Sequence, residues 1–248
     1  MPIHTLARRP DLIPALDHPH LNPGPQVMFH DQDSTRLWPH LPATFGEHQL
    51  ALVENGQVIA RAHSVPLAWH HSEHDLPQGG YAWALRQAFD DHTHQRTPTI
   101  AVALYIAITP THQGQRLSAH MAKALRTNAA SHGLTALAAP LRPTLKHHYP
   151  LIPMAEYANW KRPDGTHFDP WIRTHHRLGA HILHPCQESM HVTGTLHQWR
   201  QWAGKDLPGS GEHIIDGALT PVTIDTTTDH GHYTEPNLWA WHRLEPTP

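Results

Sequence analysis

The longest apolar run in the chain, TIAVALYIAIT at residues 99–109, is followed at once by a turn and then by a helix-like segment. The run is rich in β-branched residues and lacks polar alternation, which is typical of a strand covered on both faces at the centre of a sheet. Leu117, Met121 and Leu125 then recur every four residues, as on one face of a helix. The chain must therefore fold around a buried strand that leads into a helix through the turn at residues 110–116.

The flanking segments place this strand in a mixed sheet. Two strand-like runs enclose Asn55-Gly56, and Asn-Gly between such runs is a strong hairpin signal. Residues 80–91 have apolar side chains at helical spacing, and residues 134–139 indicate another buried strand. The order hairpin, helix, strand, helix, strand predicts an α/β fold of the α+β type, with a mixed, mostly antiparallel central sheet flanked by helices.

No linker divides the chain, so we expect one compact domain in three parts. These are an irregular arm rich in Pro and His at residues 1–28, a core at residues 29–150 and a C-terminal part at residues 151–248. The C-terminal part would complete the sheet and cover a cleft in the core. Its predicted elements are helices at residues 172–178 and 196–202, and strands at residues 181–183, 189–195 and 222–224.

Charge and composition exclude several classes of partner. The net charge is −3 with neutral histidines, so the chain has no field that would attract nucleic acid. The apolar run is far shorter than the roughly 20 residues of a membrane helix, and the N-terminus lacks the apolar core of a signal peptide. The single cysteine, Cys186, excludes an intrachain disulfide. We expect a cytoplasmic protein with no nucleic-acid or membrane partner, and the sequence leaves a homodimer open.

The 28 histidines invite a metal-binding interpretation, since several of them stand in pairs or short clusters. A zinc site needs three or four ligands that converge in space, and HHSEH at residues 70–74 is not the HExxH helix signature. Most of the histidines lie at turn-like or helix-surface positions. We therefore expect no required metal, with a non-catalytic histidine-rich metal-binding protein as an alternative.

The turn after the central strand has the geometry of an anion site. A helix N-terminus exposes unpaired backbone N–H groups at the positive end of its dipole. The turn at residues 113–118 would aim several of these groups at a pyrophosphate outside the end of the strand. The turn fits neither GxxxxGK[ST] nor GxGxxG, so neither a nucleotide-hydrolase loop nor a dinucleotide fingerprint is supported.

The segment IAITPTHQGQRLS, residues 106–118, resembles the acetyl-CoA-binding segment of the GCN5-related N-acetyltransferases, in which a strand precedes Q/R-x-x-G-x-G/A and a helix. The resemblance covers about residues 30–150. It departs from the pattern at the central glycine, which is Arg116 here, and at the final Gly/Ala, which is Ser118. The Arg116 side chain can pair with a phosphate or can fill the site, and both alternatives stay open. The acetyl-CoA contacts that the resemblance implies are Ile106, Ala107, Ile108, Gln113, Gly114, Gln115, Arg116, Leu117 and Ser118, together with Arg142.

The resemblance also implies catalytic groups. In that family a helix after the next strand often carries an Asn and, seven residues later, a Tyr that protonates the CoA thiolate, and Arg142 and Tyr149 stand at this spacing. The oxyanion would lie near the amide of Ile108. No motif identifies the base that takes the proton of the amine. The candidates are Asp169, which can equally be a helix N-cap, Glu156 and His175, with Glu54 as the weakest because a turn glutamate is usually solvated.

The hypothesis from the sequence is a CoA-dependent N-acyltransferase, in which a small-molecule amine attacks acetyl-CoA directly. Trp160, Phe168 and Trp171 can line an aromatic acceptor pocket, or they can pack as core between the two parts of the chain. One alternative keeps the fold but uses a longer acyl-CoA or an acyl carrier protein as donor. Another is a degenerate acyltransferase in which Arg116 blocks CoA and only a binding role survives.

Overall fold

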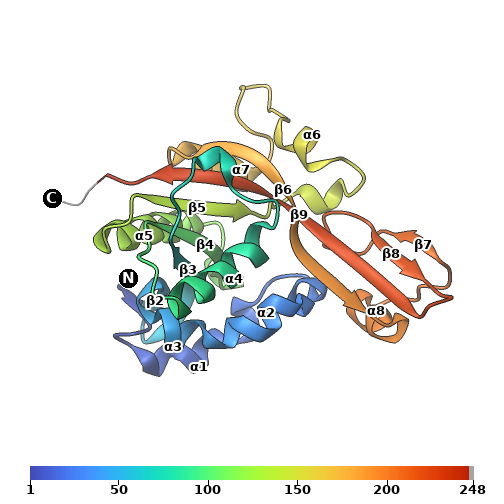
Figure 1. Cartoon of the computed structure of the whole chain (residues 1–248), viewed down its shortest axis with the longest axis horizontal. Coiled ribbons are helices and arrows are strands. Elements are labelled where there is room, and N and C mark those ends of the chain that lie inside the picture. Colours follow the sequence, from blue (N-terminus) through green and yellow to red (C-terminus); the bar gives the residue numbers. More distant parts are fainter. Residues whose placement is uncertain (246–248) are drawn as a thin grey trace.

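A nine-stranded sheet runs through the computed structural model, which describes residues 1–245 (Figure 1). Its strands are β1 (Ile3–Thr5), β2 (Gln49–Glu54), β3 (Gln57–Leu67), β4 (Ile100–Ile108), β5 (Ala136–Leu141), β6 (His181–Gly194), β7 (Gly211–His213), β8 (Val222–Asp225) and β9 (His230–Arg243). Their order is β1-β2-β3-β4-β5-β9-β8-β7, with β6 paired to β9. Among the described strands only β4 and β5 pair in parallel. The predicted mixed, mostly antiparallel sheet is confirmed.

Two long helices cover opposite faces of the sheet. Helix α4 (Gly80–Thr93) packs on Ile100 and Val102 of β4, whereas α5 (Leu117–Ser131) packs in the cluster that contains Ala101. Neighbouring strand residues point to opposite faces, so the two helices sandwich β4 between them, as its unbroken apolar character predicts. The shorter helices are α1 (Ile13–Leu16), α2 (Gln32–Leu37), α3 (Leu41–Phe45), α6 (Met154–Ala158), α7 (Pro170–Arg177) and α8 (Leu196–Ala203).

The local elements predicted for the core lie where the sequence places them. Asn55 and Gly56 both have positive φ, 50° and 79°, as a two-residue hairpin turn between β2 and β3 requires. The N-terminal arm differs from its prediction, because Ile3–Thr5 pairs with β2 at the edge of the sheet. A three-residue strand is too short to show a periodicity in the sequence.

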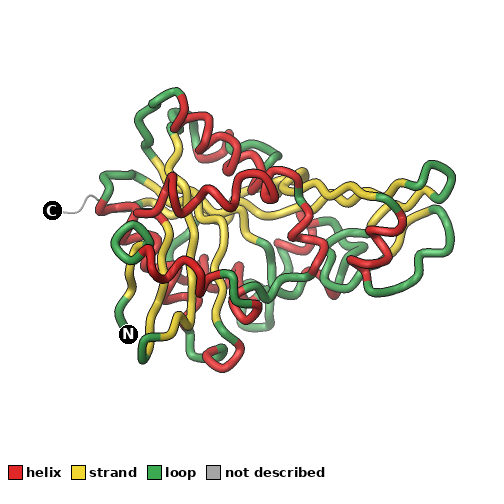
Figure 2. The backbone as a smooth tube through the Cα atoms, turned by 90° about the horizontal axis from the view of Figure 1, so that it is seen from below, coloured by secondary structure: helices red, strands yellow, loops and turns green. Residues whose placement is uncertain are grey.

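The C-terminal part extends the sheet through a long ribbon of β6 and β9, which projects away from the other strands (Figures 1 and 2). Two register shifts interrupt this pairing, between Ile182 and Pro185 and between Cys186 and Met190. The two strands predicted at residues 181–183 and 189–195 are therefore a single irregular strand. Helix α8, β7 and β8 pack around the far end of the ribbon on a second apolar cluster that contains Trp199.

Gly231 on β9 has no room for a side chain in that distal cluster. A Cβ at Gly231 would lie 2.5 Å from the indole nitrogen of Trp199, which is itself fully buried. Gly231→Ala is therefore expected to lower the free energy of unfolding by about 1–3 kcal/mol through overpacking, as measured by urea denaturation. The control is Gly209→Ala, whose added Cβ meets nothing within 4 Å. Equal losses in the two variants would contradict this packing.

Candidate functional site

Strands β4 and β5 separate part of the way along their length. They pair only over Ile100–Val102 and Ala136–Ala138, and beyond these residues each strand keeps only its outer partner. A cavity of about 1150 Å³ lies at this gap, lined by residues 103–108 of β4 and 139–141 of β5. The volume is at the upper end of what small-molecule sites enclose.

The cavity reaches both faces of the sheet. Ala60 and Ala62 of β3 pack in the cluster under α5, so Arg61, which lies between them, points to the opposite face. The cavity is lined on the α5 face by the turn at residues 113–118. On the other face, which α4 covers, it is lined by Arg61 and by Trp38, which packs against the α4 cluster. Two molecules can therefore enter from opposite faces and meet between β4 and β5.

The turn before α5 presents a row of free backbone donors. Among the described residues, no hydrogen bond satisfies the backbone N–H groups of residues 114–119. Gly114 and Arg116 have left-handed backbones, with φ of 78° and 60°, and such turns gather N–H groups around one point. These donors stand at the positive end of the dipole of α5. The arrangement matches the anion site that the sequence predicts.

Arg116 occupies the left-handed position at which the motif has glycine. It is the N-cap residue of α5, its side chain is exposed, and this side chain makes no hydrogen bond or ion pair with any described residue. A non-glycine residue in this backbone region costs about 1–2 kcal/mol. The guanidinium is therefore free to reach an anion in the turn and is not buried in it.

Most of the predicted acetyl-CoA contacts line the cavity. Gln115 does not, and Arg142, which does, already has its guanidinium engaged: Nε donates to the carboxylate of Glu235 at 2.9 Å and Nη2 donates to the carbonyl of Gly217. The predicted residues that line the cavity are Ile106, Ala107, Ile108, Gln113, Gly114, Arg116, Leu117, Ser118 and Arg142.

The predicted acid–base residues Tyr149, Glu156 and Asp169 do not line the cavity. Residues 142–149 contain only one 3-10 turn, Lys146–His148, so the seven-residue spacing does not put Arg142 and Tyr149 on one helix face. Prolines at both ends of this short segment prevent a longer helix. We therefore do not assign Tyr149 to the chemistry.

Asp169 is a helix N-cap, the alternative to a catalytic base that the sequence leaves open for it. It is buried and caps α7, with Oδ1 accepting from the backbone N–H of Trp171 at 2.8 Å and of Ile172 at 3.2 Å. Its Oδ2 accepts from the Tyr157 hydroxyl and from the Leu145 N–H, both at 2.8 Å. No oxygen of Asp169 is left to take a proton from a substrate.

The three aromatic residues predicted to line an acceptor pocket do not lie together in the structure. Trp171 lines the cavity and lies edge-on to His175, with ring centroids 4.4 Å apart. Trp160 and Phe168 instead pack with Tyr149 and with each other at ring distances of 4.9–6.0 Å, outside the cavity. For these two residues the core-packing interpretation matches the structure.

The central strand contains an irregularity next to the cavity. His63 pairs with Tyr105 and Ser64 pairs with Ala103, so Leu104 is an extra residue in β4. In such a bulge the extra residue is left out of the hydrogen-bonded ladder, and Leu104 lines the cavity. A backbone N–H released from the ladder at a bulge can stabilise negative charge on an oxygen, so Leu104 is a candidate for the role that we expected of Ile108, which pairs with Ala60 at the end of the strand.

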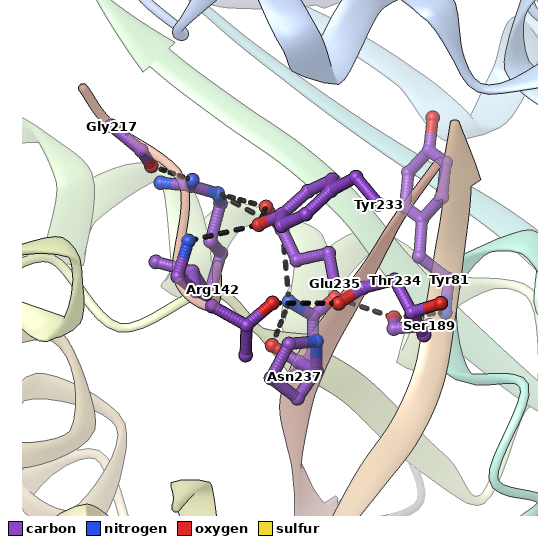
Figure 3. Close-up of polar contacts among 11 residues, drawn as sticks. Tyr81, Arg142, Ser189, Gly217, Tyr233, Thr234, Glu235 and Asn237 are labelled. Atoms are coloured by element: carbon purple, nitrogen blue, oxygen red, sulfur yellow. Dashed lines mark hydrogen bonds and ion pairs between the residues drawn. The ribbon is translucent and has the colours of Figure 1, made fainter. Parts of the chain in front are cut away.

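A buried hydrogen-bond network fixes the cavity wall (Figure 3). Glu235 on β9, which is fully buried, accepts from Arg142 Nε, from the Tyr233 hydroxyl at 2.8 Å and from Asn237 Nδ2 at 3.2 Å. The Ser189 hydroxyl on β6 donates to Asn237 Oδ1 and accepts from the backbone N–H of Tyr81 in α4. The network therefore joins β5, β6, β9 and α4 around one carboxylate.

The lining on the face that α4 covers is made of residues that the sequence did not single out as site residues. Arg61 from β3, Tyr105 from β4, Tyr81 from α4 and Trp38 after α2 all line the cavity, together with Asn22 from the arm. Burial raises the pKa of both Tyr81 and Tyr105, so both phenols are protonated at neutral pH. These residues come from five separate segments, and no local motif links them.

Other candidate chemistry is limited. Burial raises the pKa of Cys186 to about 12, so its thiol stays protonated and is a poor nucleophile.

Within residues 1–245, no three His, Cys, Asp or Glu side chains gather in a group that could hold a metal ion. None of the helices over the same residues combines the length and hydropathy needed to cross a bilayer.

Comparisons with known proteins agree with this geometry. No family model matches the chain. It is 31% identical to the arginine N-acetyltransferase avaD of Aspergillus versicolor over 273 residues, which cover 98% of this chain and 93% of that relative.

Solved structures share the fold at low sequence identity. The loading GNATL domain of CurA from Lyngbya majuscula has a TM-score of 0.53 at 13% identity, over 98% of this chain and 96% of that chain. The GphF GNAT-like decarboxylase, solved with isobutyryl-CoA, has a TM-score of 0.58 at 12% identity, over 99% of this chain and 100% of that chain.

Proposed function

The chain belongs to the GCN5-related N-acetyltransferase family and is a CoA-dependent N-acyltransferase, and we propose that its acceptor is arginine or a close analogue. The observation that carries the proposal is the cavity between β4 and β5, which has free backbone donors at its α5 mouth and a separate polar lining on the other face. The 31% identical relative named for arginine supports this class of acceptor.

The residues on the α5 face fit the donor. The free N–H groups of residues 114–119 and the guanidinium of Arg116 would hold the pyrophosphate of acetyl-CoA. The gap between β4 and β5 would receive the pantetheine arm, and the backbone N–H of Leu104 at the bulge would polarise the thioester carbonyl. Acetyl-CoA supplies the activated acyl group, which a neutral amine can attack directly.

The residues on the other face fit a cationic acceptor. Asp17 and Asp216 line the cavity and are exposed, and neither carboxylate makes a side-chain hydrogen bond or ion pair with any described residue. They would attract a guanidinium or ammonium group. Tyr81 and Tyr105 are the protonated phenols on this side, and either can supply a proton to the departing thiolate in place of Tyr149.

Titration of the purified protein with acetyl-CoA by calorimetry tests the donor half. Arg116→Glu is expected to raise the Kd about tenfold, which corresponds to about 1.4 kcal/mol, because it puts an anion beside the pyrophosphate. The matched control is Lys123→Glu, an exposed charge reversal on the same helix that does not line the cavity. It should change the Kd by less than about twofold.

Two results would contradict this assignment. If the unaltered protein gives no heat and no thermal stabilisation with acetyl-CoA, the turn is not a donor site. If Arg116→Gly tightens binding about tenfold, the arginine blocks the turn and the degenerate alternative is correct. A cytoplasmic location and a homodimer stay predictions from the sequence.

A further inference from the structure

Arg61 on β3 is a buried cation with no carboxylate partner. The residue is 3% exposed, and its guanidinium donates from Nη2 to the side-chain oxygen of Asn22. Its Nε is buried and has no hydrogen-bond partner. Arg142, a half-buried arginine that also lines the cavity, is paired with Glu235. A buried charge without a counter-charge costs several kcal/mol, so its retention needs an explanation.

The groups around Arg61 hold it in place without neutralising it. The guanidinium carbon lies 4.9 Å from the ring centroid of Tyr105 and 5.9 Å from that of Trp38, within the range of cation–π contacts. His63, two residues along the strand, is buried, and the same burial keeps its pKa low and its ring neutral. The carboxylate of Asp17 also lines the cavity and is near enough for its charge to favour the charged form of Arg61, but the two side chains make no ion pair or hydrogen bond. The guanidinium is therefore oriented, and no anion is in contact with it.

The position of Arg61 decides which ligand could supply that anion. Its side chain points to the α4 face of the sheet, whereas the free N–H groups that suit the pyrophosphate lie on the α5 face. A phosphate in the turn is therefore on the wrong side of the sheet to pair with Arg61. The missing anion belongs to the molecule that enters from the acceptor side.

We propose that Arg61 binds the carboxylate of the acceptor, so that the enzyme acts on amino acids and discriminates against the corresponding decarboxylated amines. This inference rests on the proposed function and names the substrate class of the same site. The acceptor side then carries one buried cation with two free carboxylates, Asp17 and Asp216, and this pattern complements an amino acid with a cationic side chain. A guanidinium recognises a carboxylate with charge-assisted and directional hydrogen bonds.

The test compares three acceptors that differ only at this group: arginine, argininamide and agmatine. The unaltered enzyme is expected to show a kcat/KM for arginine about 100-fold above that for argininamide or agmatine, which equals about 2.7 kcal/mol. Arg61→Gln should lower kcat/KM for arginine by about the same factor and change the other two far less, so that the three values converge. Arg61→Lys keeps the charge but loses the planar guanidinium. Its kcat/KM for arginine should lie between that of the unaltered enzyme and that of Arg61→Gln.

Controls separate recognition from folding. The Kd for acetyl-CoA and the thermal midpoint of Arg61→Gln report whether the donor side and the fold are intact. Arg36→Gln removes an exposed arginine on α2 whose ion pair is with Asp33, and it should leave the arginine preference unchanged.

Three results would overturn the inference. The first is an unaltered enzyme that uses argininamide or agmatine as well as arginine. The second is an equal loss with all three acceptors in Arg61→Gln, which would mean that Arg61 only positions the cavity wall. The third is an enzyme that binds acetyl-CoA but acetylates none of the three. Failure to bind acetyl-CoA at all would instead refute the proposed function.

Discussion

Glu235→Ala is expected to lower the free energy of unfolding by about 3–5 kcal/mol, because it removes the fully buried carboxylate of an ion pair together with the acceptor of three donors. Glu235 is fully buried and receives hydrogen bonds from Arg142, Tyr233 and Asn237 (Figure 3). The substitution leaves the guanidinium of Arg142 beside the cavity with only the carbonyl of Gly217 as partner. Urea denaturation at neutral pH measures the loss.

The design of this experiment includes three comparisons. Tyr233→Phe removes a neutral donor from Glu235 and the acceptor of the Leu219 N–H, and should cost about 1–3 kcal/mol. Glu212→Ala removes an exposed glutamate on β7 and should change stability by less than about 0.5 kcal/mol. The double variant Arg142→Leu, Glu235→Leu removes both charges, so it should recover part of the loss of Glu235→Ala. A Glu235→Ala loss no larger than that of Glu212→Ala would show that the carboxylate does not organise the wall.

The strand, turn and helix that form the α5 mouth of the cavity could be predicted from the sequence because they are contiguous. A buried strand, a turn and a helix follow one another over residues 100–131, and the periodicity of each element is visible locally. The turn donors belong to the backbone, so they survive the replacement of the motif glycine by Arg116. Side-chain identity matters less here than the order of the elements.

The acceptor side could not be predicted, because pairing in three dimensions assembles it. In the sequence, Arg61 stands between Ala60 and Ala62, and a lone arginine there has the same pattern as a residue that faces water, although β3 is buried throughout residues 59–65. Its partners Trp38, Tyr105 and Asn22 reach it through the register of β3 with β4 and through the path of the arm. None of these contacts corresponds to a recognisable spacing of residues in the sequence.

Tyr149 shows how little a spacing in the sequence determines about geometry. Its distance from Arg142 matches a motif, but a spacing constrains geometry only when the intervening residues are helical. Here Pro143 and Pro150 leave room for one 3-10 turn, and the tyrosine packs against Trp160. Asp169 shows the value of the local alternative, since its place before Pro170 already indicates an N-cap.

Acidification from pH 7 to pH 5 is expected to destabilise the protein by about 2 kcal/mol for each histidine that is buried in its neutral form. Burial lowers the pKa of His48 to about 4, that of His175 to about 3 and that of His242 to about 4, and it places the pKa of His63 well below its usual range. His175 and His242 also contact each other, with Nδ1 and Nε2 2.9 Å apart. The four together can exhaust the stability of an ordinary domain, about 5–15 kcal/mol.

The sign follows from proton binding. Between about pH 6.5 and pH 4 the unfolded chain binds protons at these histidines and the folded chain does not, so stability falls as the pH falls. Urea denaturation at pH 7 and pH 5 gives the difference for the unaltered protein and for His48→Gln, in which it should shrink by about 2 kcal/mol. His230→Gln is the control, because His230 is exposed and its ring is hydrated in the folded as in the unfolded chain. If His48→Gln shows the same difference in stability between pH 7 and pH 5 as the unaltered protein, the His48 imidazole of the unaltered protein is protonated inside the fold. Water or an anion must then lie beside it and stabilise the charge.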